Sequence, residues 1–339
     1  MRRILHFLLL CCAVLLPGRA AEITVLQWNV WQEGTVVEGG YEAIVSEIAR
    51  LRPDFVTLSE VRNYGGADFI ARLCRSLARR GLTYHGVRTD DSGILSRHAL
   101  RGTATVFPLR DDHGSVYRIR AEAYGRTFSV YTAHLDYLDD AYYNVRGYDG
   151  STWKPCPVPA TAREALERNA RSCRDEAVAA LLRSADDDER EGCVSIVGGD
   201  FNEPSYLDWC DATRHLFDHH GLAVPWPQTL RLAEAGFTDC WRALYPNPVT
   251  HPGFTFPADN PDVPVERLTW TPAADERERI DYVFFRGEGM SVAECRIFGP
   301  RGTIARSRRC PAEWDEPFVL PLGLWPTDHK GLLVRLRVD

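Results

Sequence analysis

Apolar and polar residues alternate along many short segments of the chain, and this period of two is typical of β-strands. The alternation is clear at residues 23–30. Further strands are expected at 54–58, 83–87, 93–96, 103–107, 116–123, 127–134, 279–285, 291–298 and 331–338, and residues 193–197 are expected to form an apolar strand. Helical spacing of apolar residues predicts helices at 41–51 and 68–79, and one long helix from about 161 to 183. Residues 137–160, rich in Tyr, Gly and Pro, are expected to form an irregular insertion.

The order of these elements indicates an α/β protein in which strands and helices do not alternate strictly. We therefore expect a four-layered α/β sandwich, with two mostly antiparallel β-sheets packed face to face and helices outside. No Pro-, Gly- or Ser-rich linker and no low-complexity stretch divides the sequence, so residues 21–339 are expected to form a single domain.

The first 20 residues have the pattern of a secretory signal peptide. Arg2 and Arg3 precede an apolar run at 4–16, which ends in Pro17, Gly18 and small residues. That run is shorter than the roughly 20 residues that cross a bilayer, and no comparable run follows it, so no stable membrane span is expected. The sequence predicts cleavage of this leader and a secreted or periplasmic protein, which we expect to be a monomer.

The net charge of the chain limits the partners that it can bind, and the number of cysteines bears on disulfides. Residues 1–20 hold three of the 40 Lys and Arg residues and none of the 47 acids, so the mature chain has a net charge near −10. This charge disfavours tight binding to duplex nucleic acid. The eight cysteines beyond residue 20 are an even number, compatible with disulfides in an exported protein; Cys156 with Cys173 and Cys295 with Cys310 are nearest-neighbour guesses.

Acidic, amide and histidine side chains recur where the expected strands begin or end, which is where scaffolds usually carry their sites. The set comprises Asn29, Glu60, His134, Asp200, Asn202, Asp281, Asp328 and His329. Any one of them alone is a weak signal, since a lone aspartate at a strand end is more often a cap or a turn former. Their order along the chain is the informative feature.

In that order, the motifs GGDFN at 198–202, RIDYVFF at 279–285 and TDH at 327–329 resemble the endonuclease/exonuclease/phosphatase superfamily of deoxyribonuclease-I-like metal-dependent phosphoesterases. The resemblance extends over residues 23–336 and implies an exported, bacterial-type member. The family often has serine where Thr327 stands, which leaves Asp328 and His329 in place.

The resemblance implies roles that suit the chemistry of phosphoester hydrolysis, in which phosphate charge is neutralised and water is activated. Glu60, with Asn29 and Asp328, would bind Mg²⁺, or alternatively Mn²⁺ or Ca²⁺. Asp200 would orient and deprotonate the water, Asn202 would hold a phosphate oxygen, and His134 and His329 would donate to phosphoryl oxygens. Asp281 would orient one of the two histidines. Which histidine it serves is open at this point.

Other residues are weaker candidates. Arg97 follows a strand similar to one that lies near substrate in the family, so a phosphate contact is expected there. Asp136 is as well explained by an ordinary loop acid. Packing explains most of the late tryptophans better than a place in a substrate cleft; they are Trp226, Trp270, Trp314 and Trp325. His219 and His220 are expected in a solvated turn, and residues 186–189 at a charged helix end.

The sequence thus predicts a secreted, divalent-metal-dependent phosphoesterase that hydrolyses a phosphodiester or phosphomonoester by metal-assisted attack of water. Its partner would be a phosphate ester: a small molecule, a lipid headgroup or a nucleic acid. One alternative is an extracellular nuclease acting on DNA or RNA specifically. Another, less favoured because every expected site residue is present, is a non-catalytic binding protein on the same fold. No GxSxG elbow of a serine hydrolase occurs.

Overall fold

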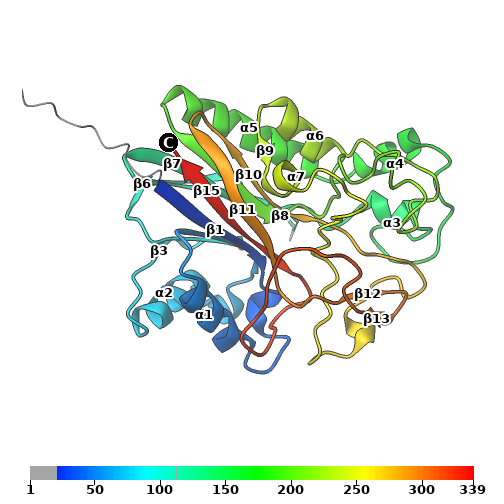
Figure 1. Ribbon diagram of the computed structural model, residues 1–339, viewed down its shortest axis with the longest axis horizontal. Coiled ribbons are helices and arrows are strands. Elements are labelled where there is room, and N and C mark those ends of the chain that lie inside the picture. The colour runs from blue at the N-terminus through cyan, green and yellow to red at the C-terminus, as the bar shows by residue number, and fades with distance from the viewer. Residues whose placement is uncertain (1–20, 112) are drawn as a thin grey trace, which may run out of the picture.

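A computed structural model describes residues 21–111 and 113–339, so the predicted signal peptide lies outside the described residues. Within these residues, one sheet has seven strands (Figure 1). Its order is β14 (Phe318–Val319), β11 (Met290–Phe298), β15 (Gly331–Val338), β1 (Ala21–Asn29), β2 (Phe55–Val61), β4 (Asp91–Ser96) and β3 (His85–Gly86). Only β1 with β2 and β11 with β14 pair in parallel among the described strands of this sheet.

The second sheet has six strands in the described part of the chain. Its order is β5 (Leu100–Phe107), β6 (Ser115–Ala123), β7 (Arg126–His134), β8 (Val194–Asp200), β10 (Asp281–Arg286) and β9 (Thr238–Asp239). Here β7 and β8 are parallel, whereas the other neighbours are antiparallel. A separate ribbon of β12 (Thr303–Ala305) and β13 (Arg308–Cys310) lies beside the sandwich.

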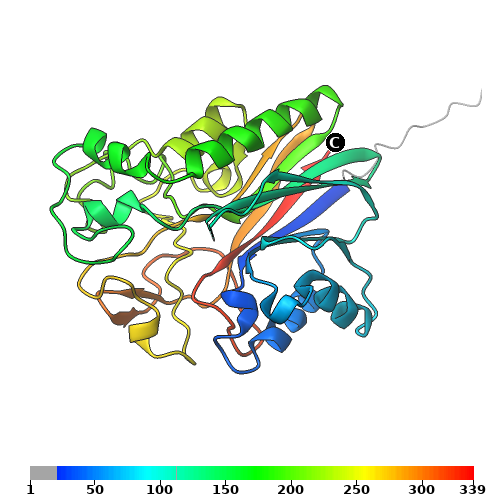
Figure 2. The ribbon, with the colours of Figure 1, turned by 180° about the vertical axis from the view of Figure 1, so that it is seen from behind.

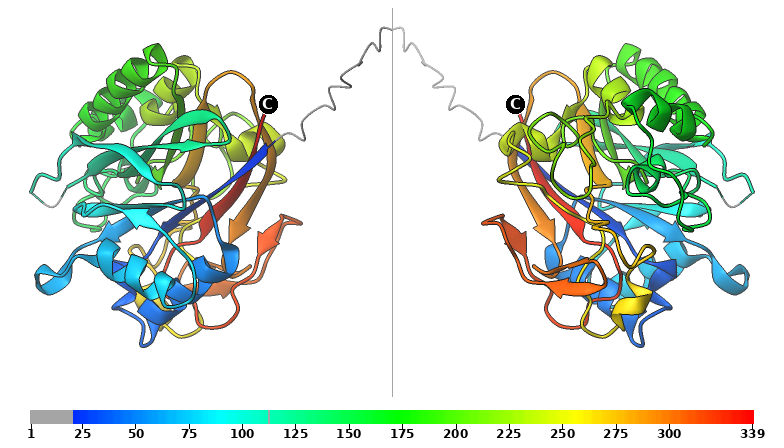
Figure 3. Two further views of the ribbon diagram at one scale, coloured as in Figure 1. Left: turned by 90° about the vertical axis from the view of Figure 1, so that its left-hand side faces the viewer. Right: turned by 90° about the vertical axis from the view of Figure 1, so that its right-hand side faces the viewer.

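Helices cover the outer faces of the two sheets, as Figures 1 and 2 show from opposite sides. The helices α1 (Gly40–Leu51) and α2 (Phe69–Ala78) pack on the seven-stranded sheet, where Ile44 and Ile48 meet Trp28. The helices α5 (Arg174–Arg190) and α6 (Pro227–Glu234) pack on the six-stranded sheet, where Val178 meets Val197. The end views in Figure 3 show the resulting layers, so the predicted four-layered sandwich is confirmed.

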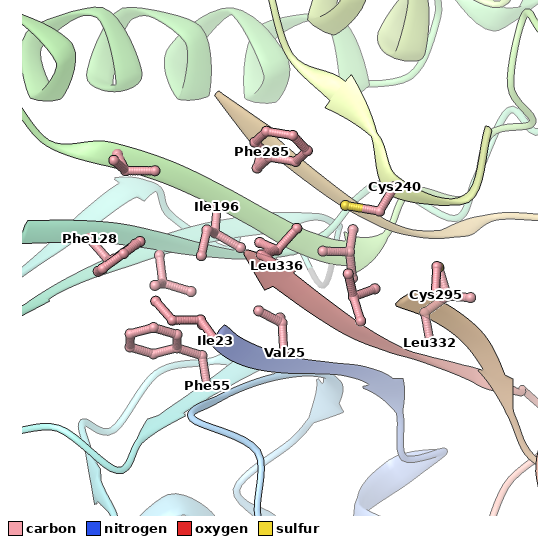
Figure 4. Close-up of a cluster of buried hydrophobic side chains, with 14 of the residues drawn as sticks. Ile23, Val25, Phe55, Phe128, Ile196, Cys240, Phe285, Cys295, Leu332 and Leu336 are labelled. Atoms are coloured by element: carbon pink, nitrogen blue, oxygen red, sulfur yellow. The ribbon is translucent and has the colours of Figure 1, made fainter. Parts of the chain in front are cut away.

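The main core lies between the two sheets (Figure 4). Alternate residues of β1, Ile23 and Val25, point into it with no exposed surface, and so do Val130 of β7 and Ile196 of β8. Because side chains of a strand alternate between faces, the residues between these pack under the helices instead. The central strands are therefore buried on both faces, as in β8, whereas the alternating strands, such as β5, have one face that is more exposed.

The predicted long helix at 161–183 is wrong, because the structure has two helices, α4 (Ala162–Asn169) and α5, separated by residues 170–173. The break turns the buried Arg174 inward, where its guanidinium donates to the Asp136 carbonyl at 2.6 Å and to Asp140 Oδ1 at 3.0 Å. Asn169 Oδ1 accepts from the same guanidinium at 2.9 Å. No Gly or Pro marks the break, so tertiary hydrogen bonds cause it. The insertion at 137–160 is irregular apart from α3 (Ala141–Val145).

Two smaller expectations also fail. All eight cysteines of the described residues carry free thiols, so neither guessed disulfide is present. His219 is 2% exposed and stacks on Trp209 at 3.7 Å between ring centroids, so it does not lie in a solvated turn. Among the described residues, no helix is both long enough and apolar enough to cross a membrane. The short helix α7 (Cys240–Leu244) lies against β11.

Candidate active site

The layer between the sheets changes from apolar to polar toward one end. On β1 the inward residues run from Val25 to Gln27 and Asn29, all without exposed surface. On β8 the same change runs from Ile196 to Asp200. Cross-sheet hydrogen bonds replace apolar packing at this end, where Asn29 Nδ2 donates to Asp200 Oδ2 at 2.9 Å. Most of these buried polar groups bond one another, whereas Gln27 Oε1 has no hydrogen-bond partner.

Strand register aligns the central residues of this polar end. His134 of β7 pairs with Asp200 of β8, and Asp200 pairs with Asp281 of β10, so three inward side chains lie in one row. The sheets approach closely just behind the row, since a Cβ on Gly198 would lie 2.2 Å from Thr57 Oγ1. Only glycine fits there. The GGDFN motif thus combines a close approach of the sheets with a carboxylate at its edge.

Each of two histidines is held by its own aspartate. His329 Nδ1 lies 2.9 Å from Asp281 Oδ2, which settles the partner that the sequence left open. His134 Nδ1 lies 2.8 Å from Asp91 Oδ2, a residue that the sequence analysis missed. These contacts direct both Nε2 atoms toward Asp200, whose Oδ2 lies 3.7 Å from that of His329 and 3.9 Å from that of His134.

The acids around the histidines raise their pKa values. Burial lowers the pKa of His134, but the charge and hydrogen bond of Asp91 outweigh it and raise the value to about 9. Burial likewise opposes the charges of Asp281 and Asp200, which raise the pKa of His329 to about 10. Both imidazoles therefore carry a proton at neutral pH and present an N–H at Nε2. Burial and the charge of Asp281 raise the pKa of Asp200 above its ordinary value.

Asn202 completes the row from the loop after β8. Its amide Nδ2 donates to the Leu135 carbonyl at 3.0 Å and lies 3.2 Å from His134 Nε2. Its backbone N–H donates to Asp200 Oδ1 at 3.0 Å, with the backbone in the left-handed region at φ +48°. With His134 protonated, two N–H groups face the same point. Because the two nitrogens are only 3.2 Å apart, an anionic oxygen that lies beside the pair would accept from both.

Carboxylates crowd the other side of the row. Glu60 follows a bulge in β2 and has φ +65°, a conformation that is uncommon outside glycine. Its Oε1 accepts from Asn29 Nδ2 at 3.1 Å and its Oε2 from the Gln32 backbone N–H at 3.0 Å. Burial, with the charges of Glu60 and Asp200, raises the pKa of Asp328 to about 7. Such crowding of buried acids suits a divalent cation with oxygen ligands.

A second set of metal-ligand type lies nearby. Ligand atoms of Asp200, Asp281 and His329 lie within 4.8 Å of one another among the described residues. However, Asp281 and His329 already bind each other, and the remaining Asp281 oxygen accepts from Gln27 Nε2 at 3.0 Å. Both Asp281 oxygens are thus already engaged, and the other carboxylates that line the cleft are Glu60, Asp140 and Asp328.

The row opens into a cleft of about 450 Å³. Six of the eight predicted residues line it: Glu60, His134, Asp200, Asn202, Asp328 and His329. The other two lie directly behind them, Asn29 bonded to Glu60 and Asp200, and Asp281 bonded to His329. The structure therefore brings together all eight residues, which span 300 positions of sequence. Residues that sequence reasoning missed also line the cleft, among them Arg62, Tyr143 and Trp153.

Two weaker candidates, Arg97 and Asp136, do not line the cleft. Because β4 is antiparallel to β2, Arg97 lies at the end of β4 opposite Glu60, and its Nη1 donates to the Arg52 carbonyl at 3.1 Å. The expected substrate contact of Arg97 is therefore wrong. Asp136 instead accepts from the Cys173 N–H at 3.0 Å. Of the four late tryptophans, Trp270 lines the cleft. The buried Trp226 and Trp325 pack in the interior, and Trp314 meets Phe254 edge to face, as packing predicted for most of the four.

Comparison with known proteins accounts for this geometry. The model of the Endonuclease/Exonuclease/phosphatase family matches residues 26–329, which include every residue of the row. The chain belongs to this family. It is accordingly a metal-dependent hydrolase of phosphate esters. Over 272 residues it is 28% identical to the uncharacterized protein F14F9.5 of Caenorhabditis elegans, covering 78% of this chain and 79% of that one.

Solved structures with the same fold are more distant in sequence. An endonuclease/exonuclease/phosphatase from Beutenbergia cavernae is similar with a TM-score of 0.50 and 18% identity, over 95% of this chain and 72% of that one. TDP2 of D. rerio, complexed with a single-strand DNA product, has a TM-score of 0.52 and 15% identity, over 93% and 99% of the two chains. The human Nocturnin catalytic domain, with bound sulfate anion, has a TM-score of 0.52 and 16% identity, over 94% of this chain and 95% of that one.

The newly found Asp91 gives a prediction about pH. In Asp91→Asn, burial acts on His134 without the opposing carboxylate, so its pKa falls from about 9 and the imidazole loses its proton at lower pH. The alkaline limb of the kcat profile should move to lower pH, with kcat at neutral pH down about 10- to 100-fold. Asp90→Asn, one residue away and exposed, is the matched control. An unchanged pH profile for Asp91→Asn would refute the role.

Proposed function

We propose that this phosphoesterase cleaves its substrate by direct attack of a water molecule that Asp200 orients and deprotonates. The observation that carries the proposal is the position of the Asp200 carboxylate, 3.7 and 3.9 Å from two histidines that are each fixed by another acid. The raised pKa of Asp200 also favours its action as a base near neutral pH.

The histidines and Asn202 bind the phosphoryl group. The Nε2–H groups of His134 and His329 and the amide of Asn202 donate to its oxygens, where negative charge grows in the transition state. Asp91 and Asp281 keep the two imidazoles protonated and aimed, so little reorganisation is needed during the reaction. The buried site makes each of these contacts stronger than it would be in water.

Glu60 and Asp328, together with Asn29, would hold Mg²⁺, with Mn²⁺ or Ca²⁺ as alternatives. A bound divalent ion neutralises the phosphate and polarises its phosphorus–oxygen bonds. The crowded carboxylates support this placement, because the charges of Glu60 and Asp200 contribute to the raised pKa of Asp328. Asn29 joins the two halves of the site, since its amide donates to both Glu60 and Asp200.

The proposed substrates are phosphodiesters and phosphomonoesters. We also propose that the protein is exported after removal of residues 1–20.

A nuclease specific for DNA or RNA is the second candidate, and the aromatic lining of the cleft favours it. A non-catalytic binding protein is disfavoured, since the cleft retains the acid, both histidines and both histidine partners. N-terminal sequencing of the mature protein tests export: a first residue within the predicted leader would contradict it.

The test is a substrate panel at saturating Mg²⁺: short DNA and RNA oligonucleotides, sphingomyelin, inositol phosphates, sugar phosphates and bis-aryl phosphate. We expect hydrolysis of at least one class, and in ¹⁸O-labelled water the phosphorus product should gain one labelled oxygen. Asp200→Asn, assayed in parallel, should remove the activity. Failure of the pure protein to hydrolyse any ester, or label in the alcohol product instead, would contradict the proposal.

A further inference from the structure

Two tryptophans form one wall of the catalytic cleft. Trp153 comes from the insertion after β7, and Trp270 comes from the loop before β10, so neither belongs to the sandwich. Their rings stack, with centroids 4.7 Å apart and planes inclined by 29°. Tyr143 meets Trp153 edge to face at 6.5 Å. The loops on this side of the molecule lie around α3 and α4 and the β12–β13 ribbon, beyond the ends of the strands (Figures 1 and 2).

Trp270 is exposed but its backbone is firmly held. Its side chain and backbone together are 53% exposed, whereas Glu276 beside it is 1% exposed. The Glu276 carboxylate accepts from the Trp270 N–H at 3.1 Å, from the Thr271 Oγ1 at 3.2 Å and from the Tyr143 hydroxyl at 3.1 Å. A buried carboxylate therefore joins the two aromatic loops. An exposed aromatic held in place loses little entropy when it binds a ligand.

Packing accounts for Trp153, which lies against an apolar cluster, but it does not explain the exposed Trp270. Trp209 and Trp226 in the same part of the chain are at most 1% exposed and form an apolar cluster, as structural tryptophans do. Trp153 covers one face of the Trp270 indole, so the exposed area is left to the other face and its edges. A single free indole face beside a phosphate-binding row suits a flat ring carried by the substrate.

We propose that Trp270, backed by Trp153, is a stacking subsite for a nucleobase attached next to the scissile phosphate. This inference rests on the proposed function, because it names the substrate of the same site. The substrate class is a nucleotide ester: a dinucleotide, a nucleoside phosphate ester or a single strand. Base stacking of this kind tolerates all bases, so the subsite selects for a base and not for a sequence.

Other ligands fit the wall less well. A quaternary ammonium headgroup is opposed by the like charge of Arg267, which lines the same cleft with its guanidinium carbon 5.9 Å from the Trp31 ring centroid. An acyl chain needs a continuous apolar channel, but carboxylates interrupt this lining at Glu60, Asp140 and Asp328. A nucleotide uses both parts, with the base on the indole and the phosphate near the arginine.

The charge of the protein selects for single strands over duplexes. With a net charge of −7 for the whole chain, and near −10 after removal of the leader, backbone attraction contributes little affinity. A duplex also keeps its bases stacked on each other and away from Trp270. Stacking on an aromatic side chain supplies roughly 1–3 kcal/mol per base without a basic surface. The subsite therefore lets an acidic protein bind a nucleic-acid substrate.

The experiment compares thymidylyl-thymidine with its two singly abasic analogues and the doubly abasic analogue, all at saturating Mg²⁺. Wild type should lose about tenfold in kcat/KM when the stacked base is absent, mainly through KM. Trp270→Ala should show the same loss on the parent dinucleotide and no further loss on the doubly abasic one. Trp270→Phe should recover most of the difference. Tyr124→Ala, at a residue 55% exposed that does not line the cleft, should change nothing.

Binding gives a readout that does not depend on turnover. In the Asp200→Asn background, the dinucleotide should quench tryptophan fluorescence, the doubly abasic analogue should not, and Trp270→Phe should weaken the quenching. If KM is lower for a thymidine dodecamer than for the dinucleotide, the subsite binds a base within a strand. If the two KM values are equal, it binds the base of a small nucleotide. Both results support a base subsite. A single strand and its duplex hydrolysed equally well would contradict it.

Different failures are distinguishable. If wild type hydrolyses parent and abasic substrates equally, the base subsite is wrong while the phosphoesterase function stands. If Trp270→Ala weakens both equally, the wall binds the sugar or only shapes the cleft, and the nucleobase assignment falls. If wild type hydrolyses neither, but the dinucleotide binds with Trp270-dependent quenching, the subsite stands and the proposed catalysis fails.

Discussion

The Asp200→Asn variant is expected to lose about 10²- to 10⁴-fold in kcat, while KM changes little. An amide keeps the size of the side chain and can still accept one of the hydrogen bonds from Asn29 or Asn202, but it cannot take a proton from water. Because Asp200 is buried and its pKa is raised, replacing it is not expected to unfold the protein. Stopped assays of kcat and KM at saturating Mg²⁺, with thermal unfolding as the control for folding, give the measurement.

The matched variant is Asp281→Asn, one strand away in the same row. Asp281 acts through His329, and the loss of such a partner usually costs about 10- to 100-fold, so this variant should be the milder of the two. If Asp200→Asn retained more than about a tenth of wild-type kcat while Asp281→Asn were inactive, the roles would be reversed. Asp281 would then be the better candidate for the base.

The Glu60→Gln variant is expected to raise the Mg²⁺ concentration for half-maximal activity by roughly 100-fold or more. Removal of a residue that hydrogen-bonds a metal ligand already lowers the affinity for the metal by about 10- to 100-fold. Glu60 is proposed to bind the ion directly, so its loss should have a larger effect. Titration of activity against Mg²⁺, and calorimetry of Mg²⁺ binding to the protein alone, measure the two effects. Glu42→Gln, an exposed carboxylate on α1 outside the cleft, is the control. Unchanged Mg²⁺ dependence in Glu60→Gln would move the ion elsewhere, first to Asp200, Asp281 and His329.

Much of the fold was predictable because alternation marks strands with one exposed face, such as β5, and a short apolar run marks a strand buried on both faces, such as β8. The inward positions of β1 and β8 also end in polar residues at the same edge, so Asn29 and Asp200 were candidates by their place at strand ends. Motif resemblance then supplied roles for them. Local pattern could not supply register across sheets, which decides that Asp281 serves His329 and that Arg97 lies at the far end of β4.

The misses have physical causes of the same kind. Asp91 stands in an ordinary acidic pair at the start of β4, and only the packing of one sheet on the other brings it to His134 of β7. The break before Arg174 comes from hydrogen bonds to residues distant in sequence. Trp153 and Trp270 lie in loops that no period describes, and Glu276 joins those loops through contacts that appear only in three dimensions.

The central claim is that one buried row of acids, histidines and amides hydrolyses phosphate esters with a divalent ion. The most direct measurement is the initial rate of the wild-type protein on its best panel substrate, first in excess chelator and then after Mg²⁺ is restored. The account predicts loss of activity in chelator and recovery with Mg²⁺, whereas Asp200→Asn stays inactive in both. Full hydrolysis in excess chelator would contradict it.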